Sequence, residues 1–216
     1  MPPSLIVFDL DGTLVDSRRD IAESANALLV ACGSNPLPEE TIGRMVGNGA
    51  ATLVSRAFAA ASAERPADAL EQFLAIYDAR LLAHTRPYPG IPEVLEELGA
   101  RSALAVLTNK PLAATQAILA GLDLARFFAD GSVVGGDGPF ARKPEPDGLL
   151  HLASRFGAAP AATLLVGDSF VDWQAARNAG AAICLARYGF GFEGFPTEEL
   201  TPADRTIDAP LDLLAL

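Results

Sequence analysis

Basic residues are scarce in this chain of 216 residues. Sixteen lysines and arginines stand against 27 aspartates and glutamates, so the formal net charge is −11. This charge argues against partners that are polyanions, because nucleic acids and anionic membranes attract basic surfaces. A small phosphate group can still bind an acidic protein, but only at a local positive site. We therefore expect no nucleic-acid partner and no membrane partner.

Cysteine and long apolar runs are also lacking. Cys32 and Cys184 are the only two cysteines, and their wide separation excludes a disulfide framework or a paired metal-ligand motif. They are typical of reduced thiols in the cytosol. No apolar run approaches the length of a membrane span, and the N-terminus lacks the basic and apolar regions of a signal peptide. These features predict a cytoplasmic protein.

What the chain does contain is an alternation of short apolar runs with helical patterns. Half of the residues are hydrophobic, which is enough for one sizeable core and a small accessory module. Strands are predicted over 5–8, 103–107, 132–134, 164–166 and 182–185. Helices are predicted over 92–98, 111–120, 149–156 and 171–179. The alternation predicts an α/β fold with a Rossmann-like parallel sheet and helices on both faces.

A helical insert interrupts this alternation. Helices are predicted over about 17–31, from 38 onward and over 50–61, and an apolar stripe predicts one long helix over 67–84. No strand pattern occurs between 16 and 84. We therefore expect a catalytic core of residues 1–15 and 86–216, with a small α-helical cap domain over 16–85. The tail over 194–216 is expected to pack only peripherally.

Two aspartates directly follow the first predicted strand. Asp9 and Asp11 end a buried apolar run, where carboxylates are unfavourable unless a cation compensates them. Hard oxygen ligands of this kind suit Mg²⁺. The alternative is an ordinary Asp-x-Asp-Gly turn. An EF-hand loop is excluded, because Thr13 stands where that loop needs an aspartate or asparagine.

Polar residues also follow the other predicted strands, and ligands of parallel sheets bind at these strand ends. Thr108 and Asn109 precede a helix whose N-terminus can attract an anion. Asp168 ends another strand. Asp172 is either an acid stabilised by the dipole of the following helix or a member of the site. Lys143 precedes a proline and can act as a point charge for phosphate, although such loops are usually just solvated surface.

In their order along the chain, these residues resemble the four motifs of the haloacid dehalogenase-like hydrolases, and the helical insert looks like the small cap of that superfamily. The resemblance covers nearly the whole chain. Within the superfamily, the chain is most similar to phosphoglycolate phosphatases. The superfamily motifs correspond to residues 9–13, 107–109, 143 and 167–172, and the subfamily resemblance lies in 46–50, 108–111 and 187–190.

The resemblance implies a role for each candidate residue. Asp9 would attack phosphorus as the nucleophile, and Asp11 would protonate the leaving alcohol and then activate water. Mg²⁺ would be bound by the side chains of Asp9 and Asp168 and by the backbone carbonyl of Asp11.

The remaining candidates would support this chemistry. Thr108, Asn109 and Lys143 would hold the phosphoryl oxygens. Asp172 would orient Lys143 or a metal-bound water. The implied function is a Mg²⁺-dependent phosphatase that hydrolyses a small phosphate monoester through an aspartyl-phosphate. The resemblance favours 2-phosphoglycolate as the substrate. It would act as a monomer or small homo-oligomer.

Several alternatives remain at this point. Asp11 disfavours a dehalogenase, and the absence of lysine from 17–84 excludes a Schiff-base phosphonatase. A sugar phosphomutase of the same superfamily or a non-catalytic binding module stays open. In the insert, residues 47–49 are either a substrate-facing loop or a turn, with the turn favoured. Arg18 and Arg44 are candidate contacts for a substrate carboxylate, but long arginines are more often solvated.

Overall fold

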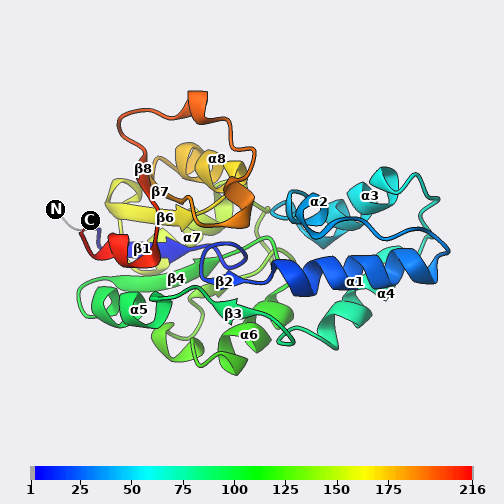
Figure 1. Cartoon of the computed structure of the whole chain (residues 1–216). Helices are drawn as coiled ribbons and strands as arrows, with labels where there is room; N and C mark the ends of the chain where they lie inside the picture. The colour runs from blue at the N-terminus through cyan, green and yellow to red at the C-terminus, as the bar shows by residue number, and fades with distance from the viewer. Residues whose placement is uncertain (1–2, 216) are drawn as a thin grey trace.

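A computed structural model of the protein describes residues 3–215 (Figure 1). Its strands are β1 (Leu5–Phe8), β2 (Val15–Asp16), β3 (Arg86–Pro87), β4 (Ala103–Leu107), β5 (Val133–Val134), β6 (Thr163–Gly167), β7 (Ala182–Ala186) and β8 (Arg205–Ile207). Its α-helices are α1 (Arg18–Ala31), α2 (Glu39–Gly43), α3 (Ala50–Ala60), α4 (Ala69–Asp78), α5 (Ile91–Gly99), α6 (Leu112–Gly121), α7 (Asp147–Arg155) and α8 (Phe170–Ala179). Short 3₁₀ turns are η1 (Ala125–Phe127), η2 (Pro160–Ala162), η3 (Phe190–Phe192), η4 (Thr197–Glu199) and η5 (Pro210–Ala215).

The main sheet is six-stranded and parallel, with the order β5-β4-β1-β6-β7-β8. β1 lies in the middle, paired with β4 on one side and β6 on the other. A parallel sheet requires a crossover between neighbouring strands, and helices supply most of these crossovers here. The predicted α/β class with a parallel sheet is confirmed.

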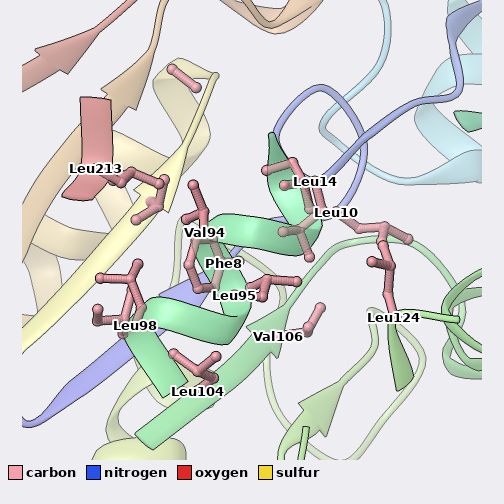
Figure 2. Close-up of a cluster of buried hydrophobic side chains, with 14 of the residues drawn as sticks. Phe8, Leu10, Leu14, Val94, Leu95, Leu98, Leu104, Val106, Leu124 and Leu213 are labelled. Carbon is pink, nitrogen blue, oxygen red and sulfur yellow. The ribbon is translucent and has the colours of Figure 1, made fainter. Parts of the chain in front are cut away.

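Each face of the sheet is covered by helices because the strands are apolar on both sides. In β1, Ile6 and Phe8 join the core under α5 and α6, whereas Leu5 and Val7 join the core under α7 and α8. Figure 2 shows Phe8 beside Val94 and Leu95 of α5. All four β1 residues are buried. The continuous apolar run at the start of the chain is therefore the central strand.

The helices α1 to α4 lie to one side of the sheet (Figure 1). They surround a hydrophobic cluster of their own that includes Leu28, Phe58 and Phe73. The antiparallel pair β2–β3 stands where the chain enters and leaves this group of helices. A helical segment after the first strand was expected, and it forms a packed unit rather than a loop.

The helix α4 is shorter than predicted. It ends at Asp78, whereas the apolar stripe predicted a helix through residue 84. Beyond a turn, the end of the predicted span makes a long-range contact instead. The N–H groups of His84 and Thr85 donate to Asp20 Oδ2 of α1, at 2.9 and 2.8 Å. Asp20 is fully buried, and residues 84 and 85 therefore bind α1 rather than extend α4.

The C-terminal segment contributes more than the predicted peripheral packing, so that prediction was wrong. Its strand β8 extends the sheet beyond β7, and Leu213 of η5 packs in the core near Leu98 (Figure 2). Only Ile207 of β8 is buried. A three-residue strand with a single buried side chain has no periodicity that a sequence pattern can reveal.

Within residues 3–215, no helix is both long enough and apolar enough to cross a membrane. The thiols of Cys32 and Cys184 are both free, and Cys184 is completely buried in β7.

Candidate active site

The polar residues predicted at strand ends meet at one edge of the sheet. Asp9 follows β1, Thr108 follows β4, and Asp168 follows β6. Because β1 lies between the other two strands in a parallel arrangement, all three carboxyl ends point to the same edge. All three side chains are buried. The strand order thus assembles a site from distant parts of the chain.

Asp9 lies against Lys143, which comes from the segment between β5 and α7. The Nζ of Lys143 lies 2.8 Å from Asp9 Oδ1 and 2.5 Å from Asp172 Oδ1. Burial raises the pKa of Asp9 to about 6, and Lys143 opposes that rise. Burial lowers the pKa of Lys143, but Asp172 and Asp9 outweigh it and hold the pKa above its usual range. Lys143 is therefore a charged ammonium beside the candidate nucleophile.

Three carboxylates form an acidic cluster at this edge. Asp9, Asp168 and Asp172 each offer an oxygen, and these oxygens lie within 4.8 Å of one another. Burial raises the pKa of Asp168 well above its usual value, and the charges of Asp9 and Asp172 raise it further. Such a buried cluster favours a compensating cation, and carboxylate oxygens are ligands that Mg²⁺ prefers. The residues present fit a divalent metal ion.

Asp172 contacts both the N-terminus of α8 and Lys143. It is the third residue of α8, where it forms a capping box with Ser169: the Ser169 N–H donates to Asp172 Oδ2 at 3.1 Å, and the Asp172 N–H donates to Ser169 Oγ at 3.4 Å. Its other oxygen accepts from Lys143. The helix cap therefore fixes the carboxylate that holds the lysine.

The segment after β1 turns tightly around Gly12. The N–H groups of Leu14 and Val15 both donate to the Leu10 carbonyl, at 3.0 and 3.1 Å. Gly12 has a φ of +87°, and a Cβ there would lie 1.8 Å from Asp168 Oδ2. The backbone over Asp-x-Asp-Gly thus forms a tight turn, and this turn makes room for the Asp168 carboxylate.

The side chain of Asp11 has different partners from that of Asp9. Ser17 Oγ donates to Asp11 Oδ1 at 2.6 Å, and Lys110 Nζ lies 2.9 Å from both Asp11 oxygens. Burial lowers the pKa of Lys110, but Asp11 outweighs it and holds the pKa above its usual range. Two carboxylates that are two residues apart therefore face separate lysines.

Thr108 and Asn109 differ in how freely they can meet a ligand. The amide nitrogen of Asn109 donates to the carbonyls of Gly47 and Lys143, at 2.8 and 2.9 Å. These bonds use both of its N–H groups, so the side chain ties the 47–49 loop and the Lys143 segment to the end of β4. The Thr108 hydroxyl accepts only a 3.2 Å bond from the Lys110 N–H, which leaves its own proton available to donate.

A cavity lies between this edge of the sheet and the helices α1, α3 and α4. Its floor includes Asp9, Asp11 and Thr108. Its walls on the helical side are mostly apolar, and residues 47–49 belong to it through Gly47 and Gly49. The apolar residues that line it are Ile21, Val46, Ala50, Leu53, Phe73, Leu74, Pro111 and Ala114. The loop over 47–49, for which a simple turn was favoured, therefore faces the cavity.

Arg18 and Arg44 do not line this cavity. Arg18 lies 3.4 Å from Glu39 and 3.8 Å from Glu193, and Arg44 lies 3.4 Å from Glu193. Both arginines thus pair with carboxylates outside the cavity, as expected for solvated side chains. Neither is placed to contact a ligand above Asp9.

A family model of haloacid dehalogenase-like hydrolases matches residues 3–180, which contain every residue described in this site. The chain belongs to the haloacid dehalogenase-like hydrolases. The resemblance seen in its sequence motifs is therefore confirmed.

Curated relatives of this hydrolase are named phosphoglycolate phosphatase. One from Rhodospirillum rubrum is 41% identical over 200 residues, which are 88% of this chain and 82% of the relative. One from Agrobacterium fabrum is 39% identical over 209 residues, covering 94% and 88%. The crystal structure of a predicted phosphoglycolate phosphatase from Haemophilus somnus 129PT superposes with a TM-score of 0.90 at 34% identity, covering 98% and 96%. These likenesses confirm the expectation of a phosphoric monoester hydrolase.

Lys110 lies within residues 108–111, which carried the subfamily resemblance, but no role in the site was predicted for it from the sequence. Its side chain is only 6% exposed, and its Nζ lies 4.5 Å from the ring centroid of Tyr77 in α4. A simple signal was present in the sequence. The hydrolase has just two lysines, Lys110 and Lys143, and both are buried at the same edge of the sheet.

Proposed function

We propose that this hydrolase is a Mg²⁺-dependent phosphatase whose substrate is 2-phosphoglycolate. The observation that carries the proposal is the division between Asp9 and Asp11. Asp9 belongs to the acidic cluster beside Lys143, and Asp11 faces the same cavity from outside that cluster. Hydrolysis of a phosphate ester through an aspartyl-phosphate needs two different carboxylates of this kind, one to attack phosphorus and one to protonate the leaving alkoxide.

In the first step, an Asp9 oxygen attacks phosphorus and the bond from phosphorus to the leaving oxygen breaks. Asp11 gives its proton to that oxygen, which departs as an alcohol. In the second step, Asp11 takes a proton from water, and the water oxygen attacks the phosphorus of the aspartyl-phosphate. Inorganic phosphate leaves, and Asp9 is restored as a carboxylate with Asp11 again protonated.

The other residues of the site would stabilise the phosphoryl group. Lys143 supplies a buried positive charge beside Asp9, and the Thr108 hydroxyl can donate to a phosphoryl oxygen. Asn109 contributes by holding the Lys143 segment in place. The side chains of Asp9 and Asp168 and the Asp11 carbonyl would hold Mg²⁺, which neutralises phosphate charge when bound. Asp172 orients Lys143.

We further propose that residues 16–85 act as a cap over a catalytic core made of 1–15 and 86–216. Support comes from the separate hydrophobic cluster of α1 to α4 and from their apolar walls above Asp9. A cap of this kind excludes water and contacts the leaving group. The two free thiols favour a cytoplasmic enzyme, and we expect a monomer or small homo-oligomer.

The test is a panel of phosphate esters, including 2-phosphoglycolate and β-glucose 1-phosphate, assayed with Mg²⁺ and after chelation by EDTA. Phosphate release should need Mg²⁺ and should be lost in Asp9→Asn. Asp11→Asn should lower kcat by about 100- to 10,000-fold for an alkoxide leaving group. The loss should be much smaller for p-nitrophenyl phosphate, whose leaving group needs little protonation.

Full activity of Asp9→Asn would refute the mechanism. Phosphate transfer on β-glucose 1-phosphate without release would favour a phosphomutase. Binding of phosphate without turnover of any ester would favour a non-catalytic module.

A further inference from the structure

We propose that Lys110 is a specificity-determining residue that binds a carboxylate carried by the leaving group of the substrate. The proposal rests on the proposed function, because it assigns the substrate class within the same site. It begins from the one charged residue of the cavity that the phosphatase mechanism does not use.

Lys110 lies where a leaving group must be. Asp11, as the proton donor, has to contact the ester oxygen that departs. The Nζ of Lys110 is 2.9 Å from both Asp11 oxygens. A cation is therefore held one hydrogen bond away from the group that touches the leaving oxygen. A short substrate with a carboxylate on the carbon next to that oxygen would bring the carboxylate to Lys110.

Lys110 also has one hydrogen-bond donor beyond the two that Asp11 uses. An ammonium carries three N–H groups, and the two Asp11 oxygens account for two of them. Beyond them, the side chain faces the ring of Tyr77 and the cavity, and Ile21 and Phe73 line the same space. Ile21 and Phe73 compete for no hydrogen bond. The Tyr77 hydroxyl interacts with the ammonium but is a neutral partner, so an anion in the cavity would be the stronger partner for Lys110.

No other cation among the described residues lines this cavity. Arg18 and Arg44 pair with Glu193 elsewhere. Arg142 lies near the 47–49 loop, but its Nε donates to the Gly136 carbonyl at 2.5 Å, and the residue does not line the cavity. Lys143 contacts Asp9 and is used for the phosphoryl group. Recognition of a second anionic group therefore falls to Lys110.

The experiment compares two substrates of similar size, 2-phosphoglycolate and ethyl phosphate, which lacks the carboxylate. Both are assayed with wild type, Lys110→Met and Lys110→Gln in the presence of Mg²⁺. Wild type should prefer 2-phosphoglycolate. Each variant should reduce the ratio of the two kcat/KM values by about 10- to 100-fold, the size of a lost charge-assisted hydrogen bond, with most of the change in KM.

Arg44→Met is the matched control, because it also removes one positive charge but from an exposed side chain outside the cavity. Its ratio should stay within twofold of wild type. Circular dichroism of each variant checks that the fold is retained, and Lys110→Arg should keep part of the preference because it keeps the charge.

The outcomes separate this proposal from the proposed function. If Lys110 only positions Asp11, both substrates lose activity equally and the ratio is unchanged, which would overturn the proposal while the phosphatase assignment stands. If wild type hydrolyses ethyl phosphate as well as 2-phosphoglycolate, no carboxylate is recognised and both the proposal and the substrate assignment fail. If neither ester is hydrolysed, the proposed function fails first.

Discussion

At the scale of single residues, the site depends on which lysine each aspartate meets. Asp9 lies beside Lys143, and Asp11 lies beside Lys110. Both pairs are almost fully buried, so each charge depends on its partner for compensation. In a protein with a net charge of −11, the two lysines are concentrated at one edge of the sheet, which gives the local positive site that an anionic substrate would need.

Replacing Lys143 by methionine should both inactivate and destabilise the enzyme. The change leaves Asp9 and Asp172 as buried carboxylates without their common partner. Removing one member of a buried ion pair lowers the free energy of unfolding by about 3–5 kcal/mol. Urea denaturation at neutral pH without metal measures it.

The control for this variant is Arg126→Met. It breaks an ion pair with Asp123 whose side chains are 53% and 77% exposed, and exposed pairs contribute at most about 1 kcal/mol. A Lys143→Met protein as stable as Arg126→Met would mean that the lysine does not compensate the acidic cluster.

At the scale of elements, the turn after β1 and the loop after β7 enclose Asp168. In the loop after β7, the Gly191 N–H donates to Asp168 Oδ2 at a distance of 2.7 Å. Gly12 lies in the turn after β1, where its positive φ allows the turn and its missing Cβ leaves room for the Asp168 carboxylate. The geometry of a backbone turn thus sets the place of the Asp168 carboxylate, one of the proposed metal ligands.

Gly12→Ala should therefore inactivate the enzyme. The new Cβ has to displace Asp168 or the turn itself, in addition to the strain of a positive φ. The matched control is Gly33→Ala, which has a φ of +77° but no atom within 4 Å of its Cβ. It should cost about 1 kcal/mol of stability and leave kcat/KM unchanged. Steady-state kinetics with thermal melts of both variants checks this, and an active Gly12→Ala would contradict the proposed arrangement.

At the scale of the whole molecule, the candidate active site lies between the sheet and the separately packed helices α1 to α4. Asp9 and Asp168 come from strand ends of the sheet, Lys143 comes from the segment between β5 and α7, and the helices α1, α3 and α4 supply most of the cavity walls. The two parts of the fold meet at Lys110, which contacts Asp11 at the edge of the sheet and Tyr77 in α4. A ligand bound in the cavity therefore contacts both parts of the fold.

Mg²⁺ should stabilise the folded protein even without substrate. Binding to the native state alone adds about 2.7 kcal/mol at a free concentration one hundred times the Kd. A rise in Tm with added Mg²⁺, reversed by EDTA, measures it without any activity assay. Asp168→Asn should remove the response. Asp208→Asn, which changes a carboxylate that is 73% exposed, should keep it. An equal response in both variants would contradict a metal site at the acidic cluster.

The sequence by itself determined the order of the elements and most candidate residues. The strands β1, β4, β6 and β7 are short apolar runs, and the motif residues follow directly where three of them end. These features are local, so they can be seen in a few consecutive residues. The parallel sheet then followed from the alternation of strands and helices, because such strands bring their carboxyl ends together.

Only the tertiary structure decided the partners of those residues. Lys110 and Asp11 are 99 positions apart, and Lys143 and Asp172 are 29 apart, so no local pattern could pair them. The same holds for residues 84 and 85, which bind Asp20 of α1, and for β8, which pairs only with β7. Side-chain contacts depend on how distant segments pack, and it is this packing that gives Asp9 and Asp11 their separate lysines.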